Sequence, residues 1–89
     1  MHEFYLIEGL IRKIQTIAQE QQADKVTLVK VKLGALAHIS ADHFREHFIH
    51  AVRNTVAEGA NLDVEEMKDP EDPHAQEILL DSVEIEEGK

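Results

Sequence analysis

The sequence predicts an α+β domain in which two helices pack on one face of a small three-stranded β-sheet, in the order helix, strand, helix, strand, strand (α-β-α-β-β). Near the amino end, apolar residues recur at steps of three and four, which is typical of a helix buried along one stripe. Over residues 26–33 the period changes to two, as in a half-buried strand. With 89 residues, 43% of them hydrophobic, we expect one domain over residues 1–89 with one modest core.

The first helix is expected over residues 3–21. Glu3 would lie in its first turn, where the helix dipole favours a carboxylate, and Gly9 would lie on the polar flank. The stripe that faces the core comprises Leu6, Ile7, Leu10, Ile11, Ile14, Ile17 and Ala18.

The first strand, residues 26–33, alternates an apolar face with two lysines and ends at Gly34. A second helix is expected over residues 41–54, and Ser40 or Asp42 can cap its amino terminus. The residues expected to face the core are Val29, Val31 and Leu33 in the strand and Phe44, Phe48, Ala51 and Val52 in the helix.

Two further strands are expected, over residues 61–65 and 77–86. The link between them, residues 69–76, contains two prolines and is short, which predicts that these two strands form an antiparallel hairpin. In the last strand the apolar residues change phase, and a bulge near Asp81 and Ser82 would return them to one face. These residues are Ile78, Leu80, Val83 and Ile85.

Charge and composition exclude several classes of protein. The chain has 18 acidic and 9 basic residues, a formal charge of −9 that repels nucleic acid and anionic lipid surfaces. It has no cysteine, so neither a disulfide framework nor a thiolate metal site can form within it. No apolar run approaches the roughly 20 residues of a membrane helix. We therefore expect a cytoplasmic protein that neither binds nucleic acid nor enters a membrane.

The amino-terminal residues Met1, His2 and Glu3 form a candidate metal site. The α-amine of Met1, the main-chain nitrogen of His2 and the imidazole of His2 can close two adjacent chelate rings around one ion. Nitrogen donors in a plane suit Ni(II) or Cu(II), whereas zinc prefers a tetrahedron. A free α-amine has a pKa of about 7.7 to 8.0 and an imidazole of about 6.5, so affinity at such a site should fall as the pH falls.

The second predicted helix carries an alternative metal face. His43, His47 and His50 lie within about 60° of one another around a helix of ideal pitch. Three imidazoles with an open position are the ligand set of several catalytic zinc sites. The same pattern also suits a solvated stripe or one that faces a second copy of the chain.

Four segments together resemble the HypA/HybF family of nickel metallochaperones for [NiFe]-hydrogenase maturation. They are Met1-His2-Glu3, Val31-Lys32-Leu33-Gly34, Val56-Ala57-Glu58-Gly59-Ala60 and Ser82-Val83-Glu84-Ile85-Glu86, in the family's order and at matching separations. Between the last two strands this family normally inserts a zinc module with two Cys-x-x-Cys pairs, where this chain has only residues 69–76. The chain thus resembles the nickel-binding domain without the zinc module, and no zinc is expected in a family-type four-cysteine site.

The resemblance implies which residues hold nickel. The family binds Ni(II) at its amino terminus, which corresponds here to Met1, His2 and Glu3. Some members add an acidic ligand after the first strand, where this chain has Ser40, with His38 and Asp42 nearby as substitutes. The family usually carries a serine at the position of Ala37. The implied function is delivery of Ni(II) to [NiFe]-hydrogenase or urease, with hydrogenase maturation proteins or the hydrogenase large subunit as partners.

A second function class stays open at this point. The chain has no nucleophile motif, phosphate-binding loop or supported carboxylate pair, so we do not expect an enzyme. It could instead be a metal-free protein-protein interaction domain that uses a sheet edge or the outer sheet face. Leu28 and Leu79 fall out of phase with the core and could favour a homodimer. We also expect the fold to survive without metal, since the apolar stripes need none.

Overall fold

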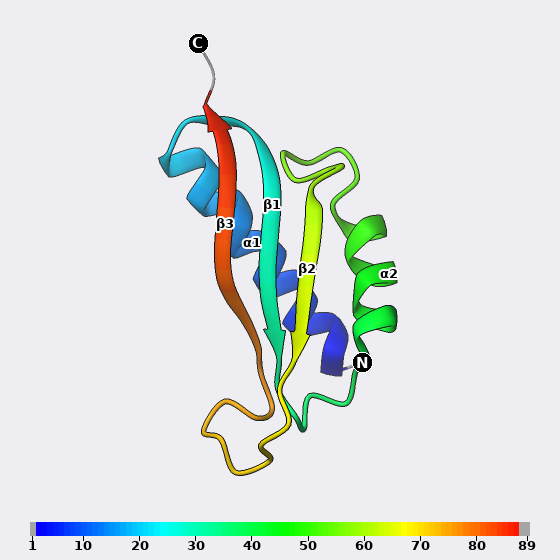
Figure 1. Cartoon of the computed structure of the whole chain (residues 1–89). Helices are drawn as coiled ribbons and strands as arrows, with labels where there is room; N and C mark the ends of the chain where they lie inside the picture. The colour runs from blue at the N-terminus through cyan, green and yellow to red at the C-terminus, as the bar shows by residue number, and fades with distance from the viewer. Residues whose placement is uncertain (1, 88–89) are drawn as a thin grey trace.

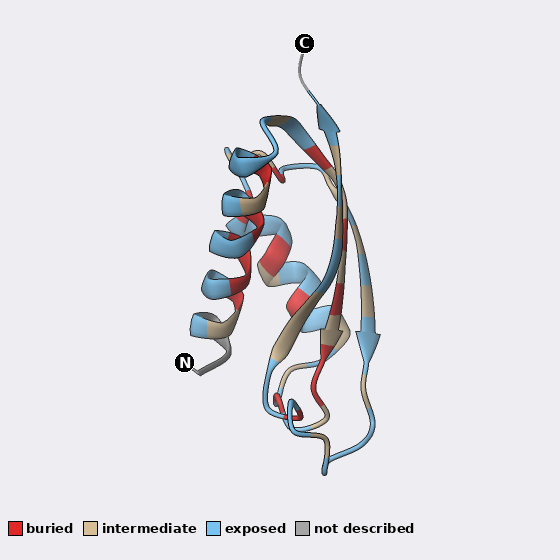
Figure 2. Ribbon diagram, turned by 90° about the vertical axis from the view of Figure 1, so that its left-hand side faces the viewer, coloured by how far each residue is buried: buried red, intermediate tan, exposed pale blue. Residues whose placement is uncertain are grey.

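The computed structural model describes residues 2–87, and the side chains of residues 5–87. The elements are α1 (His2–Glu20), β1 (Ala23–Leu33), α2 (Ala41–Ala51), β2 (Asn61–Glu66) and β3 (Ile78–Glu87). Both helices lie on one face of the three-stranded sheet (Figures 1 and 2). The predicted α+β class and the order α-β-α-β-β are therefore confirmed. Among the described residues, no helix combines the length and the apolar character that a membrane crossing requires.

The core lies between the helices and the sheet. In Figure 2 the stretches of ribbon coloured as buried lie on the sides of the helices and the sheet that face one another. Ile14 of α1 and Phe44 of α2 are completely buried, and Phe44 stacks at a tilt on Phe48 with ring centroids 5.8 Å apart. The other core residues are Ile7, Leu10, Ile11, Ala18, Val26, Val29, Val31, Leu33, Val52 and Ala57.

β1 is the central strand, with β2 on one side and β3 on the other. β1 pairs with β2 in parallel and with β3 antiparallel. The predicted hairpin of the last two strands is therefore wrong: the chain leaves β2, passes the end of β1 and returns along the opposite edge (Figure 1). Between β1 and β2 the chain returns through α2 along one face of the sheet, so that β2 begins at the same end as β1 and the two strands run parallel.

Charge explains why β1 lies between the other two strands. In the register of the sheet, Lys30 lies beside Asp63 and Lys32 beside Glu65 on the β2 side. On the β3 side, Lys25 pairs with Glu86. A hairpin of β2 and β3 would instead place two acidic outer faces next to each other, and like charges on neighbouring strands are destabilising. The order β2-β1-β3 puts the basic strand between the two acidic ones.

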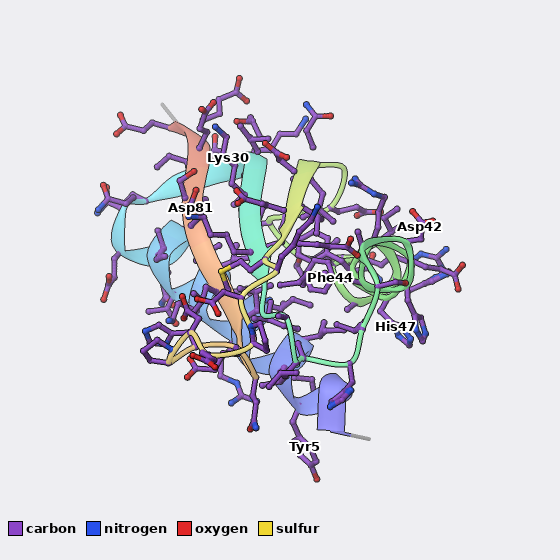
Figure 3. All side chains as sticks on the ribbon, turned by 60° about the horizontal axis from the view of Figure 1, so that its bottom comes forward. Tyr5, Lys30, Asp42, Phe44, His47 and Asp81 are labelled. Atoms are coloured by element: carbon purple, nitrogen blue, oxygen red, sulfur yellow. The ribbon has the colours of Figure 1, made fainter. Side chains whose placement is uncertain are left out.

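The bulge predicted in the last strand is present. Lys30 pairs with Ser82 and Val31 with Leu80, so Asp81 is the additional residue. Asp81 and Lys30 project from the outer face of the sheet in Figure 3. As predicted, the apolar residues on both sides of the bulge pack on the core: Ile78, Leu80, Val83 and Ile85.

The second helix is shorter than predicted. It ends at Ala51 rather than near residue 54, with Val52 as its cap. Asn54 has a φ of 64° in the left-handed region, which ends the helical backbone, and its N–H donates to the Glu58 carboxylate at 3.2 Å. Ala51 is exposed, so its assignment to the core was wrong, whereas Phe44, Phe48 and Val52 are buried.

Candidate metal centre

The amino-terminal candidate site lies at the beginning of α1. The helix begins at His2, so His2 and Glu3 belong to its first turn. Met1 and the side chains of His2 and Glu3 lie outside the described part of the structure. The first four N–H groups of a helix have no partner within the helix, so helix formation does not occupy the main-chain nitrogen of His2. A helical start at residue 2 is thus compatible with a ligand set that uses this nitrogen.

The three residues expected as additional nickel ligands lie in the link between β1 and α2 and in the first turn of α2. His38 is exposed and has a φ of 60°, a conformation that few residues other than glycine adopt. Ser40 caps α2: its hydroxyl oxygen accepts a hydrogen bond from the N–H of His43 at 3.1 Å. Asp42 lies in the first turn of α2, where a carboxylate interacts favourably with the helix dipole. Ser40 therefore has a structural role that is independent of any metal.

Glu66 also caps α2, and no local pattern in the sequence predicts this contact. Its carboxylate oxygen accepts a hydrogen bond from the N–H of Ala41 at 2.8 Å. Glu66 ends β2, and the parallel pairing with β1 carries it to the place where α2 begins. Only the strand order reveals this contact, because residues 41 and 66 lie far apart in the sequence.

The first turn of α1 and the start of α2 lie in the same half of the molecule. Figure 1 shows the beginning of both helices toward the same end of the sheet.

The histidines of α2 form a pair rather than a trio. The Nε2 atoms of His43 and His47 lie 2.9 Å apart, and the ring centroids 4.6 Å. Among the side chains of residues 5–87, no three His, Asp or Glu form a group that could hold a metal ion. His50, the third member of the predicted face, therefore does not complete a site with the other two.

His47 borders a shallow hollow between the two helices. The hollow is lined by Ile7, Glu8, Ile11, Arg12 and Gln15 of α1 and by His47 and Ala51 of α2. His47 is half-buried and His43 is exposed. In Figure 3, Phe44 points toward the sheet while His47 points away from it. The histidine pair therefore belongs to the outer surface of α2, beside α1.

Known proteins match this chain over most of its length. A family model described as hydrogenase/urease nickel incorporation, metallochaperone, hypA matches residues 1–70. Hydrogenase maturation factor HypA of Archaeoglobus fulgidus is 39% identical over 64 residues, which cover 72% of this chain and 58% of that protein. The same factor of Methylocella silvestris is 35% identical over 65 residues, covering 73% of this chain and 58% of the relative. The chain thus matches less than two thirds of the length of these curated relatives.

The fold also matches solved structures. The solution structure of the Ni metallochaperone HypA from Helicobacter pylori superimposes with a TM-score of 0.80 at 20% identity, covering 99% of this chain and 100% of that one. A second solution structure, of a HypA protein, gives a TM-score of 0.73 at 20% identity, covering 96% of each chain. At this identity, the two superpositions support the fold alone.

Proposed function

The chain belongs to the HypA family of nickel metallochaperones, and from this premise we propose that it binds Ni(II) through Met1, His2 and Glu3 and carries it to a nickel enzyme under assembly. The observation that supports this most directly is the family match over residues 1–70, which includes the terminal segment. At the level of the family, the expectation of a maturation factor rather than an enzyme is confirmed.

In the proposed site, the Met1 α-amine, the His2 main-chain nitrogen and the His2 imidazole surround the ion in one plane. Ni(II) accepts such a tetragonal nitrogen set readily. The Glu3 carboxylate, or a donor such as His38 of the link or Asp42 of the first turn of α2, supplies a further ligand. The helix dipole places partial positive charge at this terminus and weakens the hold on a cation. A weaker hold suits a carrier, which has to release its ion.

The recipient belongs to the same proposal. The family description includes both hydrogenase and urease, and the curated relatives are named hydrogenase maturation factors. We therefore propose [NiFe]-hydrogenase maturation as the pathway, with maturation proteins or the hydrogenase large subunit as partners and urease as the second recipient. Functions that relatives perform with a four-cysteine zinc module are outside this proposal, because these 89 residues contain no cysteine.

Titration of the protein with Ni(II) tests the proposed site. The protein must begin at Met1 with a free amine. We expect a terminal site that is lost in His2→Ala and strongly weakened when one glycine is added ahead of Met1, because the extra residue moves the amine out of the chelate. His74→Ala removes an exposed imidazole from the link between β2 and β3 and serves as the control. Unchanged nickel affinity in the extended protein would falsify the terminal-amine site.

A further inference from the structure

His43 and His47 are arranged as two neighbouring ligands of one metal ion. They lie one helical turn apart in α2, and their Nε2 atoms are 2.9 Å apart. Metal–imidazole bonds are about 2.05 Å long, so two nitrogens at a right angle around one ion are about 2.9 Å apart, and at a tetrahedral angle about 3.3 Å. The observed separation matches the right angle found in tetragonal Ni(II) and Cu(II) complexes.

We propose that His43 and His47 form a second binding site for a divalent transition-metal ion, separate from the amino terminus and suited to Ni(II) or Cu(II). The proposal does not depend on the terminal site, since it uses other residues on another helix. Two imidazoles fill two adjacent coordination positions. Water fills the others, which leaves the ion accessible to a further donor.

Metal binding would replace the contact that the two rings now make. A hydrogen bond between two Nε2 atoms requires one ring to carry its proton on Nε2 and the other to accept through a lone pair. If the donor ring moves its proton to Nδ1, both Nε2 lone pairs can point at the ion. The separation of the two nitrogens already fits, so rotation of the two rings about their side-chain bonds is the change that would direct both lone pairs at the ion.

The surroundings permit a cation at this place. Across the hollow that His47 borders, α1 presents one carboxylate, Glu8, and one guanidinium, Arg12. On α2 itself, Asp42 and Glu46 are the acidic neighbours in sequence of the two histidines, and both are exposed. Arg45, the basic neighbour on α2, is held toward β2, where it donates to the Leu62 carbonyl at 2.8 Å. The local charges sum to −2 without Arg45 and to −1 with it, and the whole chain carries −9. The long-range field therefore attracts a divalent cation rather than repelling it.

Bound metal should also stabilise α2. The ion would link residues 43 and 47 across one turn of a helix that has only 11 residues, Ala41–Ala51. A ligand that binds the folded chain and not the unfolded one raises the melting temperature, and the rise grows with the logarithm of the free ligand concentration above its dissociation constant. A rise in melting temperature that requires both histidines would thus report binding at this site independently of the heat of titration.

The experiment uses the full chain in the His2→Ala background, so that the terminal site does not contribute. Titration calorimetry with Ni(II), and separately with Cu(II), should show one metal ion bound per chain in His2→Ala. It should show none in His2→Ala/His43→Ala/His47→Ala. His2→Ala/His50→Ala is the matched control and should keep the bound ion, because His50 is outside the pair. Circular dichroism without metal should be the same for all variants, since neither His43 nor His47 is buried.

Three results would overturn the proposal. The first is a stoichiometric equivalent that survives loss of both His43 and His47. The second is no binding of either ion in the His2→Ala background while the parent protein binds at its terminus. The third is that His2→Ala/His50→Ala loses the bound metal as completely as the variant without His43 and His47, which would indicate a three-histidine face. Failure at the terminus alone, with this equivalent retained, would contradict the proposed function and leave the second site standing.

Discussion

Gly34 lies directly against the backbone of Ala75. A Cβ atom at position 34 would overlap the Ala75 carbonyl and lie 2.7 Å from the carbonyl oxygen of His74. Two hydrogen bonds fix the contact: Gly34 N–H donates to the Glu77 carbonyl at 2.8 Å, and Leu36 N–H donates to the Ala75 carbonyl at 2.7 Å. Ala75 is 4% exposed. The proline-containing link is therefore packed against the end of β1, and it carries the chain from β2 to the opposite edge of the sheet.

Replacing Gly34 by alanine should destabilise the fold. The new methyl group meets backbone atoms, which cannot rotate away, and such overpacking costs about 1–3 kcal/mol of unfolding free energy. Urea denaturation measures the change. Gly9→Ala is the matched control: nothing lies within 4 Å of a Cβ there, and alanine in a helix is about 0.5–1 kcal/mol more favourable than glycine. Equal midpoints for Gly34→Ala and the parent would show that the link does not pack on β1.

Ser40 allows its capping role to be separated from metal binding. Ser40→Ala removes the acceptor for the His43 N–H and should lower the unfolding free energy by about 1 kcal/mol. Ser40→Asp keeps a good capping oxygen and supplies the carboxylate that some relatives carry there, so it should retain the parent's stability.

Nickel titration of the two Ser40 variants completes the test. If the Ser40 hydroxyl only caps α2, Ser40→Ala leaves the nickel affinity unchanged despite its lower stability. A loss of nickel affinity in Ser40→Ala that Ser40→Asp restores would instead make position 40 a ligand position.

Much of the fold could be predicted from local pattern. The period of the apolar residues located both helices and all three strands, and the phase change in the last strand located the bulge at Asp81. The strand order could not be predicted from local pattern. The short link between β2 and β3 favours a hairpin, whereas the observed order depends on which strands lie side by side in the sheet. The lysines of β1 and the acidic residues of β2 and β3 are the feature of the sequence that favours β1 as the central strand.

Reversing charge on the central strand should therefore destabilise the sheet. Lys32→Glu places a carboxylate beside Glu65, and a like-charged pair on neighbouring strands costs roughly 0.2–1 kcal/mol. Lys32→Met keeps the apolar stem without the charge and should fall between the parent and Lys32→Glu in thermal unfolding. Added salt should reduce the difference between the two variants, because it screens exposed charges. A difference that is independent of salt would attribute the effect to packing rather than to repulsion.

Core and surface positions should respond very differently to truncation. Ile14 is completely buried, so Ile14→Ala should cost about 2–5 kcal/mol of unfolding free energy. Ile49 lies in α2 with 54% of its surface exposed, and Ile49→Ala should change stability by no more than about 0.5 kcal/mol. Chemical denaturation of both variants checks the pair. A similar loss in both would mean that the outer face of α2 is covered, as it would be in a homodimer.

The candidate sites were less predictable than the fold. His43, His47 and His50 share a helical face in projection, yet side-chain rotamers decide which rings meet, and only His43 and His47 do. The cap by Glu66 depends on strand order and had no local signal. The terminal residues were identified from donor chemistry and family resemblance, and their assignment as nickel ligands stays a prediction.

Nickel binding at the terminus should depend steeply on pH. The ion competes with protons for the Met1 amine and the His2 imidazole, and groups of these types titrate near pH 7.7 to 8.0 and about 6.5. Binding through the main-chain nitrogen of His2 releases a further proton, that of the amide, to the solvent. Each proton that Ni(II) displaces lowers the apparent binding constant about tenfold per pH unit below that group's range. Affinity should therefore rise from pH 6 to pH 8, where the amine and the imidazole both become free.

The pH dependence should come from the ligands and not from unfolding. Thermal melts of the metal-free protein at pH 6 and pH 8 serve as the control, because the buried side chains of the described part of the chain are all apolar and do not titrate. The acetylated protein, in which the amine cannot bind, should lose most of the affinity at pH 8. If acetylation left both the affinity and its pH profile unchanged, the nickel would have to be held elsewhere in the chain.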